Sequence, residues 1–204
     1  GFNLSTAVDS IQAATFKIKQ QEIENDYKQF LLDRDINYKI SFRNNMTQLV
    51  ITGELDIGIT TAVKNILRQR PGISTVALNS IGGHVYEGRG LSKLFTRQSL
   101  DTYVYHECSS ACTTAFSGGV KRYIGTDGKL GFHQYKHDLS INKKAVNFHN
   151  ASAEQERDLE VFKSRGIKDH FLKKIFKENS NGMWFPSHKE LIEAKVIDGV
   201  IETN

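Results

Sequence analysis

The sequence predicts an α/β domain with a mostly parallel β-sheet, preceded by one long helix. Two observations carry this prediction. Strand-like and helix-like segments alternate through the middle of the chain, and the strand predicted over residues 74–78 is an uninterrupted apolar run. Such runs are typical of parallel strands that helices bury on both faces. With 204 residues, 39% of them hydrophobic and 25% charged, the chain has the composition of one ordinary globular domain.

The N-terminal segment differs from the rest of the chain. Residues 6–32 contain neither proline nor glycine and place apolar side chains at helical spacing among charged ones. Ser5 is of a type that caps helix N-termini. We therefore expect residues 1–35 to form an N-terminal helix, used for packing or oligomerisation, and residues 36–204 to form the α/β domain.

Within the second part, each element is predicted from local periodicity and from its turn residues. β-Branched and apolar runs predict strands over residues 38–42, 48–52, 74–78, 102–105, 122–124 and 130–133. Helical spacing predicts a helix over residues 59–70, closed by Pro71 and Gly72, a second over 86–97 and a short one from about Ser110. The C-terminal third is predicted to be helical up to about residue 178, and a last helix and strand are predicted over residues 188–201.

Charge and hydropathy exclude two classes of function. The formal charge is +4, but the basic residues are spread along the chain, whereas a nucleic-acid groove requires a basic stripe with interleaved aromatics. No run approaches the roughly 18 apolar residues of a membrane span. We expect neither a nucleic-acid partner nor a span across a membrane in this chain.

Three predicted strands end in residues that are suited to catalysis. Gly82 and Gly83 follow the first of these strands, where glycine lets a backbone approach a ligand closely. Ser109 and Ser110 stand where a strand gives way to a helix, a position that suits either a nucleophile or a simple N-cap. His133 closes a third strand and is either a general base or a structural histidine.

Taken together and in this order, these segments resemble the ClpP-like serine peptidases of the Clp/crotonase fold. Residues 79–83 (NSIGG) are similar to the Asn-Ser-Pro-Gly-Gly segment of that family, and Phe132-His133-Gln134 is similar to its Ile-His-Gln. Residues 187–198 (SHKELIEAKVID) match the end of the family's domain without a gap. The Glu-Cys-x-Ser-Ala-Cys-Thr segment around Ser110 is closest to exported or periplasmic bacterial ClpP-like proteins. The likeness covers roughly residues 48–201.

The resemblance implies a fold of ββα units and a set of roles. Ser110 would be the nucleophile and His133 the general base. The N–H groups of Ala111 and of Gly82 or Gly83 would form the oxyanion hole. It also implies a peptide or protein substrate, a homo-oligomer, and chemistry without metal or organic cofactor.

The third member of the triad is where the resemblance fails. The gapless C-terminal match puts Met183 at the position of the family's Asp. Asn181 is the nearest polar replacement, and an Asn orients the catalytic His in papain-type peptidases. Asp158 and Asp169 are further candidates, although no motif supports either. A Ser-His dyad, a substitute orienting residue and an inactive site all stay open.

Cys108 and Cys112 flank Ser110 by two residues on each side. They are either a disulfide that locks the turn, which requires an oxidising compartment, or two small buried thiols. Cys112 as the nucleophile in place of Ser110 is a minor alternative. A metal site is not expected, because two Cys without a second pair of ligands do not supply the four that a structural metal needs. A disulfide would agree with the resemblance to exported bacterial proteins, and together they predict a periplasmic or secreted protein.

The sequence therefore predicts a serine hydrolase, most simply a peptidase. One rival keeps the fold as a catalytically inactive scaffold that binds peptides in the same cleft. The other is a crotonase-type acyl-CoA enzyme, whose oxyanion hole polarises a thioester while a carboxylate moves protons. Against this second rival, the predicted cleft offers Ser110 and His133 and no obvious acidic residue.

Overall fold

The computed structural model describes residues 14–15, 21, 36–135, 151–177 and 182–202. The chain divides into two units, Gly1–Ile36 and Asn37–Asn204. In the first unit Ala14, Thr15 and Gln21 are helical, and the rest of the predicted N-terminal helix lies outside the described residues. The second unit holds the predicted α/β domain and every site residue that the sequence predicts.

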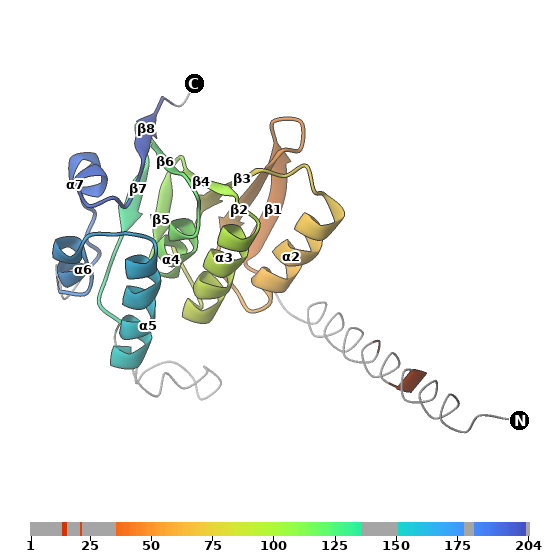
Figure 1. Ribbon diagram of the computed structural model, residues 1–204, viewed down its shortest axis with the longest axis horizontal. Helices are drawn as coiled ribbons and strands as arrows, with labels where there is room; N and C mark the ends of the chain where they lie inside the picture. Colours follow the sequence, from red (N-terminus) through yellow and green to blue (C-terminus); the bar gives the residue numbers. More distant parts are fainter. Residues whose placement is uncertain (1–13, 16–20, 22–35, 136–150, 178–181, 203–204) are drawn as a thin grey trace, which may run out of the picture. The chain divides into compact units, whose positions relative to one another are not determined.

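The second unit is built on a six-stranded sheet in the order β1-β2-β3-β4-β6-β8 (Figure 1). β1 runs antiparallel to β2, and every other neighbouring pair is parallel. A separate parallel pair, β5 and β7, extends from the ends of two sheet strands. The strands are β1 Tyr38–Arg43, β2 Gln48–Gly53, β3 Thr75–Asn79, β4 Asp101–Val104, β5 Glu107–Ser109, β6 Arg122–Gly125, β7 Lys129–Gly131 and β8 Gly199–Ile201.

Helices connect the parallel strands, as crossover connections require. Four of them, α2 to α5, pack one against the next, and α6 packs on α5 (Figure 1). The helices of this unit are α2 Ile59–Gln69, α3 Val85–Arg97, α4 Ala111–Ser117, α5 Ala151–Ser164, α6 Asp169–Ile175 and α7 His188–Glu193. Within the described residues, no helix is both long enough and apolar enough to cross a membrane.

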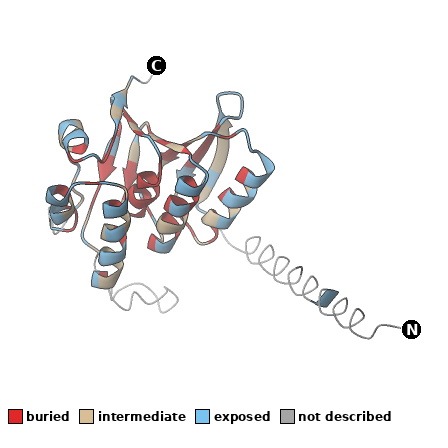
Figure 2. Cartoon of the chain, in the orientation of Figure 1, coloured by how far each residue is buried: buried red, intermediate tan, exposed pale blue. Residues whose placement is uncertain are grey.

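The core lies between the sheet and these helices, and α4 is its most buried helix. All seven residues of α4 are buried, whereas α2 and α5 bury only one side and expose the other (Figure 2). β2 and β3 contribute continuous buried runs, as predicted for parallel strands. The segment that follows Ser110 is therefore held rigidly by packing on all sides.

The structure confirms the predicted fold class, a mixed α/β domain with a mostly parallel sheet. Where the structure describes them, the predicted strands and helices of this unit occur within a few residues of their expected bounds. The helical stretch predicted to end near residue 178 is two helices, α5 and α6, and its residues 136–150 and 178 lie outside the described residues. β5 is the exception, because the sequence pattern shows no separate strand at Glu107–Ser109, next to the turn before α4. This strand has three residues and pairs with β7, about twenty residues further along the chain, so local periodicity does not show it.

Candidate active site

Three turns meet at one edge of the fold, and each follows the carboxyl end of a strand. They are the glycine turn (Gly82 and Gly83) after β3, Ser110 after β5 and His133 after β7. Backbone bonds tie them together: Ser80 bridges β5 in parallel, and Ser109 N–H donates to the Ser80 carbonyl at 2.9 Å. β5 and β7 then pair side by side. The topology thus places the three predicted functional segments together.

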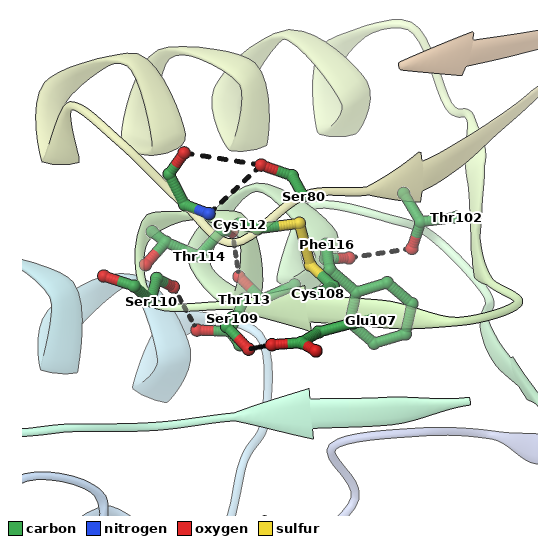
Figure 3. Close-up of a disulfide and its surroundings, with 12 residues drawn as sticks. Ser80, Thr102, Glu107, Cys108, Ser109, Ser110, Cys112, Thr113, Thr114 and Phe116 are labelled. Atoms are coloured by element: carbon green, nitrogen blue, oxygen red, sulfur yellow. Dashed lines mark hydrogen bonds between the residues drawn. A yellow bond between two sulfur atoms is a disulfide. The ribbon is translucent and has the colours of Figure 1, made fainter. Parts of the chain in front are cut away.

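Ser110 has an unusual backbone conformation, with φ 55° and ψ −130°. Non-glycine residues rarely adopt a positive φ, and such strain persists only where the surroundings impose it. Here Ser110 N–H donates to the Gly131 carbonyl at 2.8 Å. The Ser110 carbonyl accepts from the hydroxyl of Thr113 at 2.7 Å, and both residues are labelled in Figure 3. The turn therefore holds Ser110 firmly at the N-terminus of α4.

His133 lies within hydrogen-bond distance of Ser110. Its Nε2 is 2.7 Å from Ser110 Oγ, and its Nδ1 is 2.9 Å from the carbonyl oxygen of Gln134. A carbonyl can only accept, so Nδ1 carries the proton in the neutral ring and Nε2 is left as an acceptor for the Ser110 hydroxyl. This is the tautomer that a general base next to a serine requires.

The segment that carries His133 is itself fixed by the chain near residue 184. Phe132 and Trp184 form an antiparallel bridge, in which each N–H donates to the carbonyl of the other at 2.8 and 2.7 Å. The Phe132 ring packs against Phe162, Phe171 and Trp184. His133 therefore projects from a strand end that is anchored on both its backbone and its preceding side chain.

The three predicted oxyanion-hole residues differ in how their N–H groups are used. Gly82 N–H already donates to the Ser80 hydroxyl at 3.1 Å. Among the described residues, neither the Gly83 nor the Ala111 N–H group has a hydrogen-bond acceptor. Ala111 is the first residue of α4, where the partial positive charge of a helix N-terminus favours an anion. Gly83 and Ala111 are therefore better suited to the role than Gly82.

Gly82 has a different role: the space beside its Cα is too small for a side chain. Its φ is +108°, and a Cβ built on it would lie 2.7 Å from Ser110 Cβ and 2.8 Å from the Ser109 carbonyl oxygen. Neither approach is possible for a real side chain at these distances. The absence of a side chain at Gly82 lets the glycine turn lie directly against the Ser110 turn.

Cys108 and Cys112 form a disulfide that spans the Ser110 turn (Figure 3). Their Cα atoms are 5.2 Å apart, and both side chains are completely buried. Because the bond joins β5 to α4, it links the two elements on either side of Ser110. The same bond takes up both thiols, so neither is available as a nucleophile or as a metal ligand.

Ser109, the alternative to Ser110 in the sequence, is completely buried. Its hydroxyl donates to the Glu107 carboxylate at 2.7 Å, and Lys129 pairs with the same carboxylate at 3.0 Å. The hydrogen bond from Ser109, with Lys129, lowers the pKa of Glu107. The Ser109 hydroxyl is thus committed to the Glu107–Lys129 ion pair, whereas that of Ser110 lies against His133.

The candidates for a third triad member are dispersed. Asn181 lies outside the described residues. Met183 lies close to Gly131, at the edge of the site, and its thioether is only a weak acceptor. Asp169 is exposed at the start of α6. Asp158 is buried and reaches towards the site, but it binds Tyr135 and Arg89 instead of His133.

The partner on His133 Nδ1, the Gln134 carbonyl, is not among the residues that the sequence predicts. A main-chain carbonyl has no residue-type signature, so no sequence signal would have identified it. His84, beside the glycine turn, lies with its Nε2 3.6 Å from Asp56 and its ring against Tyr86. In the part of the chain that the structure describes, no three His, Cys, Asp or Glu side chains gather as metal ligands would.

Comparisons with known proteins give a result for the fold alone. No family model and no curated protein sequence matches this chain. Among solved structures, the chain is similar to ClpP1 from Listeria monocytogenes, with a TM-score of 0.60 and 18% identity over 78% of this chain and 92% of that one. A point mutant of the same ClpP1 gives a TM-score of 0.59 with the same identity and coverage. The fold is therefore ClpP-like.

Proposed function

We propose that this chain is a serine hydrolase that cleaves peptide bonds, with Ser110 as nucleophile and His133 as general base. The observation that carries the proposal is the 2.7 Å contact between Ser110 Oγ and His133 Nε2. It occurs at a strained turn before a helix, on a ClpP-like fold. An N-cap serine with no catalytic role would accept from its own helix, but the Ser110 side chain makes no capping bond to α4.

The acylation step follows from this geometry. Ser110 Oγ attacks the carbonyl carbon of the scissile amide while its proton passes to His133 Nε2. When the C–N bond of the tetrahedral intermediate breaks, the same proton moves to the departing amine. A water molecule, deprotonated by His133 in turn, then hydrolyses the Ser110 ester and restores the site. These steps use only side chains of this chain and water.

The developing oxyanion would be bound by Gly83 N–H and Ala111 N–H, which have no acceptor among the described residues. Two preorganised N–H donors in such a site typically contribute several kcal/mol to the barrier reduction. Their positions near Ser110 are fixed by the close approach of Gly82 and by the start of α4.

The neutral carbonyl of Gln134 on Nδ1 has a kinetic consequence. It selects the correct tautomer, but it lacks the negative charge with which a carboxylate stabilises the imidazolium formed during the reaction. We therefore propose an enzyme that turns over more slowly than one with a complete Ser-His-Asp triad.

Compartment and assembly form part of the same proposal. The buried disulfide between Cys108 and Cys112 favours an oxidising location, the periplasm or the exterior of the cell. The resemblance to ClpP-like peptidases favours a homo-oligomer that acts on peptides or proteins. Size-exclusion chromatography with light scattering on the oxidised protein tests the assembly.

A second candidate function is a peptide-binding scaffold without turnover. The observation that favours it is Met183 at the position where the resembled family carries its Asp, with no carboxylate bonded to His133 among the described residues. Both candidates would bind a peptide beside Ser110 and His133, so peptide binding alone does not separate them.

Intact mass after treatment with a fluorophosphonate separates them, because only an activated serine forms the adduct. We expect one adduct on the wild type, none on Ser110→Ala, and a loss of two to four orders of magnitude in labelling rate for His133→Ala. Ser109→Ala is the matched control, since this neighbouring serine is bonded to Glu107. A folded wild type that stays unlabelled would favour the scaffold and overturn the peptidase.

A further inference from the structure

Asp158 is a completely buried carboxylate that the proposed mechanism does not use. Its Oδ1 accepts from Arg89 Nη1 at 2.8 Å. Its Oδ2 accepts a short hydrogen bond from the Tyr135 hydroxyl and a longer one, at 3.4 Å, from the Thr114 hydroxyl. Burying a carboxylate is costly unless several groups compensate it, and here three do.

Each of these three partners belongs to a segment that carries part of the candidate site. Arg89 is on α3, directly after the glycine turn, and Thr114 is on α4, directly after Ser110. Tyr135 is two residues after His133. Asp158, on α5, is therefore bonded at once to the oxyanion segment, to the nucleophile segment and to the segment of the base.

Tyr135 is the partner that reaches the reacting groups. Its ring meets the His133 imidazole edge-on, with centroids 5.6 Å apart, and also packs against Phe176 at 4.9 Å. Its backbone N–H donates to Gln155 Oε1 at 2.7 Å, so α5 holds both ends of the residue. Burial, followed by the nearby Asp158 charge, raises the pKa of Tyr135 well above its usual value, which keeps the phenol a donor.

The Tyr135 ring restricts the motion of the His133 imidazole, which a main-chain carbonyl on Nδ1 cannot do. His133 has two hydrogen-bond partners, the Gln134 carbonyl on Nδ1 and the Ser110 hydroxyl on Nε2. When Ser110 Oγ attacks a substrate, only the Gln134 carbonyl still holds the imidazole, and one hydrogen bond does not stop rotation about its side-chain torsions. A ring packed against the imidazole, and anchored by its own hydroxyl, restricts that motion. A displacement of about 1 Å in such a pair costs on the order of 100-fold in rate.

We infer that Asp158 is the positioning residue of this site: through the Tyr135 phenol it holds His133 in line with Ser110, in place of a carboxylate on Nδ1. The inference rests on the proposed function for its effect on rate. Its effect on the His133 ring is independent of whether the protein hydrolyses anything, and the test uses both readouts.

The variants are Asp158→Asn, Tyr135→Phe and the two combined, with Glu154→Gln as control. Glu154 is on the same helix and binds the same Arg89, at 2.5 Å, but it is not bonded to Tyr135. Tyr135→Phe keeps the ring and the packing volume, so it carries the test if Asp158→Asn does not fold. A cooperative thermal unfolding transition identifies the variants that are folded.

The first readout is the rate of fluorophosphonate labelling at saturating and at low reagent concentration. We expect Asp158→Asn and Tyr135→Phe to lower the maximal rate by on the order of 10- to 100-fold, with little change in the half-saturating concentration. The combined variant should be no slower than the worse single one, because the two residues act as a unit. Glu154→Gln should label within about twofold of the wild type.

The second readout is the ¹⁵N spectrum of the histidine ring nitrogens. The wild type should show His133 as a single neutral tautomer with the proton on Nδ1, and Asp158→Asn should show averaged ring nitrogens. A folded Asp158→Asn with a wild-type His133 spectrum overturns the positioning role. If the wild type is not labelled at all, the proposed function fails, and this spectrum alone still decides the inference.

Discussion

At the scale of the residue, Ser110 and His133 are ordinary side chains, and what distinguishes them is how their backbones are held. Ser110 has a positive φ that its backbone hydrogen bonds and the close approach of Gly82 impose. Strain of this kind costs of order 1–3 kcal/mol and persists only in a rigid setting. The buried α4 and the disulfide provide that setting.

Gly82→Ala tests the close approach of the two turns. The added Cβ would meet Ser110 Cβ at 2.7 Å and the Ser109 carbonyl at 2.8 Å, so either the glycine turn or the Ser110 turn must move. We expect a lower melting temperature and a labelling rate at Ser110 reduced by roughly 100-fold. Gly72→Ala is the control, since a Cβ there meets nothing within 4 Å. Wild-type labelling by Gly82→Ala would contradict the described contact.

The sequence was informative about side chains and uninformative about main-chain groups and long-range pairs. The glycine turn and His133 could be picked out because each follows a predicted strand, and Ser110 because it stands at a predicted helix start and matches the nucleophile of the resembled family. The Gln134 carbonyl could not, since every residue has one. The bond of Asp158 to Tyr135 joins residues 23 positions apart on elements whose packing no local pattern specifies.

At the scale of the element, the N-terminus of helix α2 is capped by a side chain of helix α3. Its N-cap is Gly58, which has no side chain with which to cap. Instead Glu87, on α3, accepts from the backbone N–H groups of Gly58 and Thr60 at 2.6 and 3.0 Å, and from the Thr60 hydroxyl. Its negative charge also suits the positive end of the helix.

Glu87→Ala would remove the carboxylate that accepts from the Gly58 and Thr60 N–H groups at the start of α2, while the Glu87 carbonyl still accepts from the Thr60 hydroxyl at 3.3 Å. We expect the free energy of unfolding to fall by about 1–3 kcal/mol, measured by urea denaturation. Glu160→Ala, at an exposed position of α5, is the matched control and should change it by less than about 0.5 kcal/mol. Equal effects of the two substitutions would show that Glu87 does not cap α2.

The capping of α2 and the strand β5 mark the limit of prediction at this scale. α3 was predicted because its apolar spacing repeats over 13 residues, and β2 because it is a run of apolar and β-branched residues. β5 has only three residues, and the cap of α2 lies 29 residues from the helix start that it completes. Both depend on neighbours in space, which periodicity along the chain does not report.

At the scale of the whole molecule, the parallel topology and one covalent bond assemble the site. The ends of β3, β5 and β7 meet at one edge because their strands run in the same direction. Cys108–Cys112 then fixes β5 to α4 inside the core. The stability of the domain should therefore depend on the redox state of its surroundings.

Replacing both cysteines by alanine should lower the stability of the folded domain by about 2 kcal/mol, the value expected for closing so short a loop. For a domain of this size the melting temperature would fall by roughly 4–8 °C. A reductant present throughout the scan should bring the wild type down to the variant and leave the variant unchanged. A wild type that is insensitive to reductant, with free thiols detected after unfolding, would contradict the disulfide.

Rapid mixing with an activated ester of an acylated amino acid tests most directly whether Ser110 forms a covalent acyl-enzyme. We predict a burst of released alcohol equal to one equivalent per folded chain, followed by slow turnover, with no burst in Ser110→Ala and a full burst in Ser109→Ala. A folded wild type that releases alcohol no faster than Ser110→Ala would contradict the account.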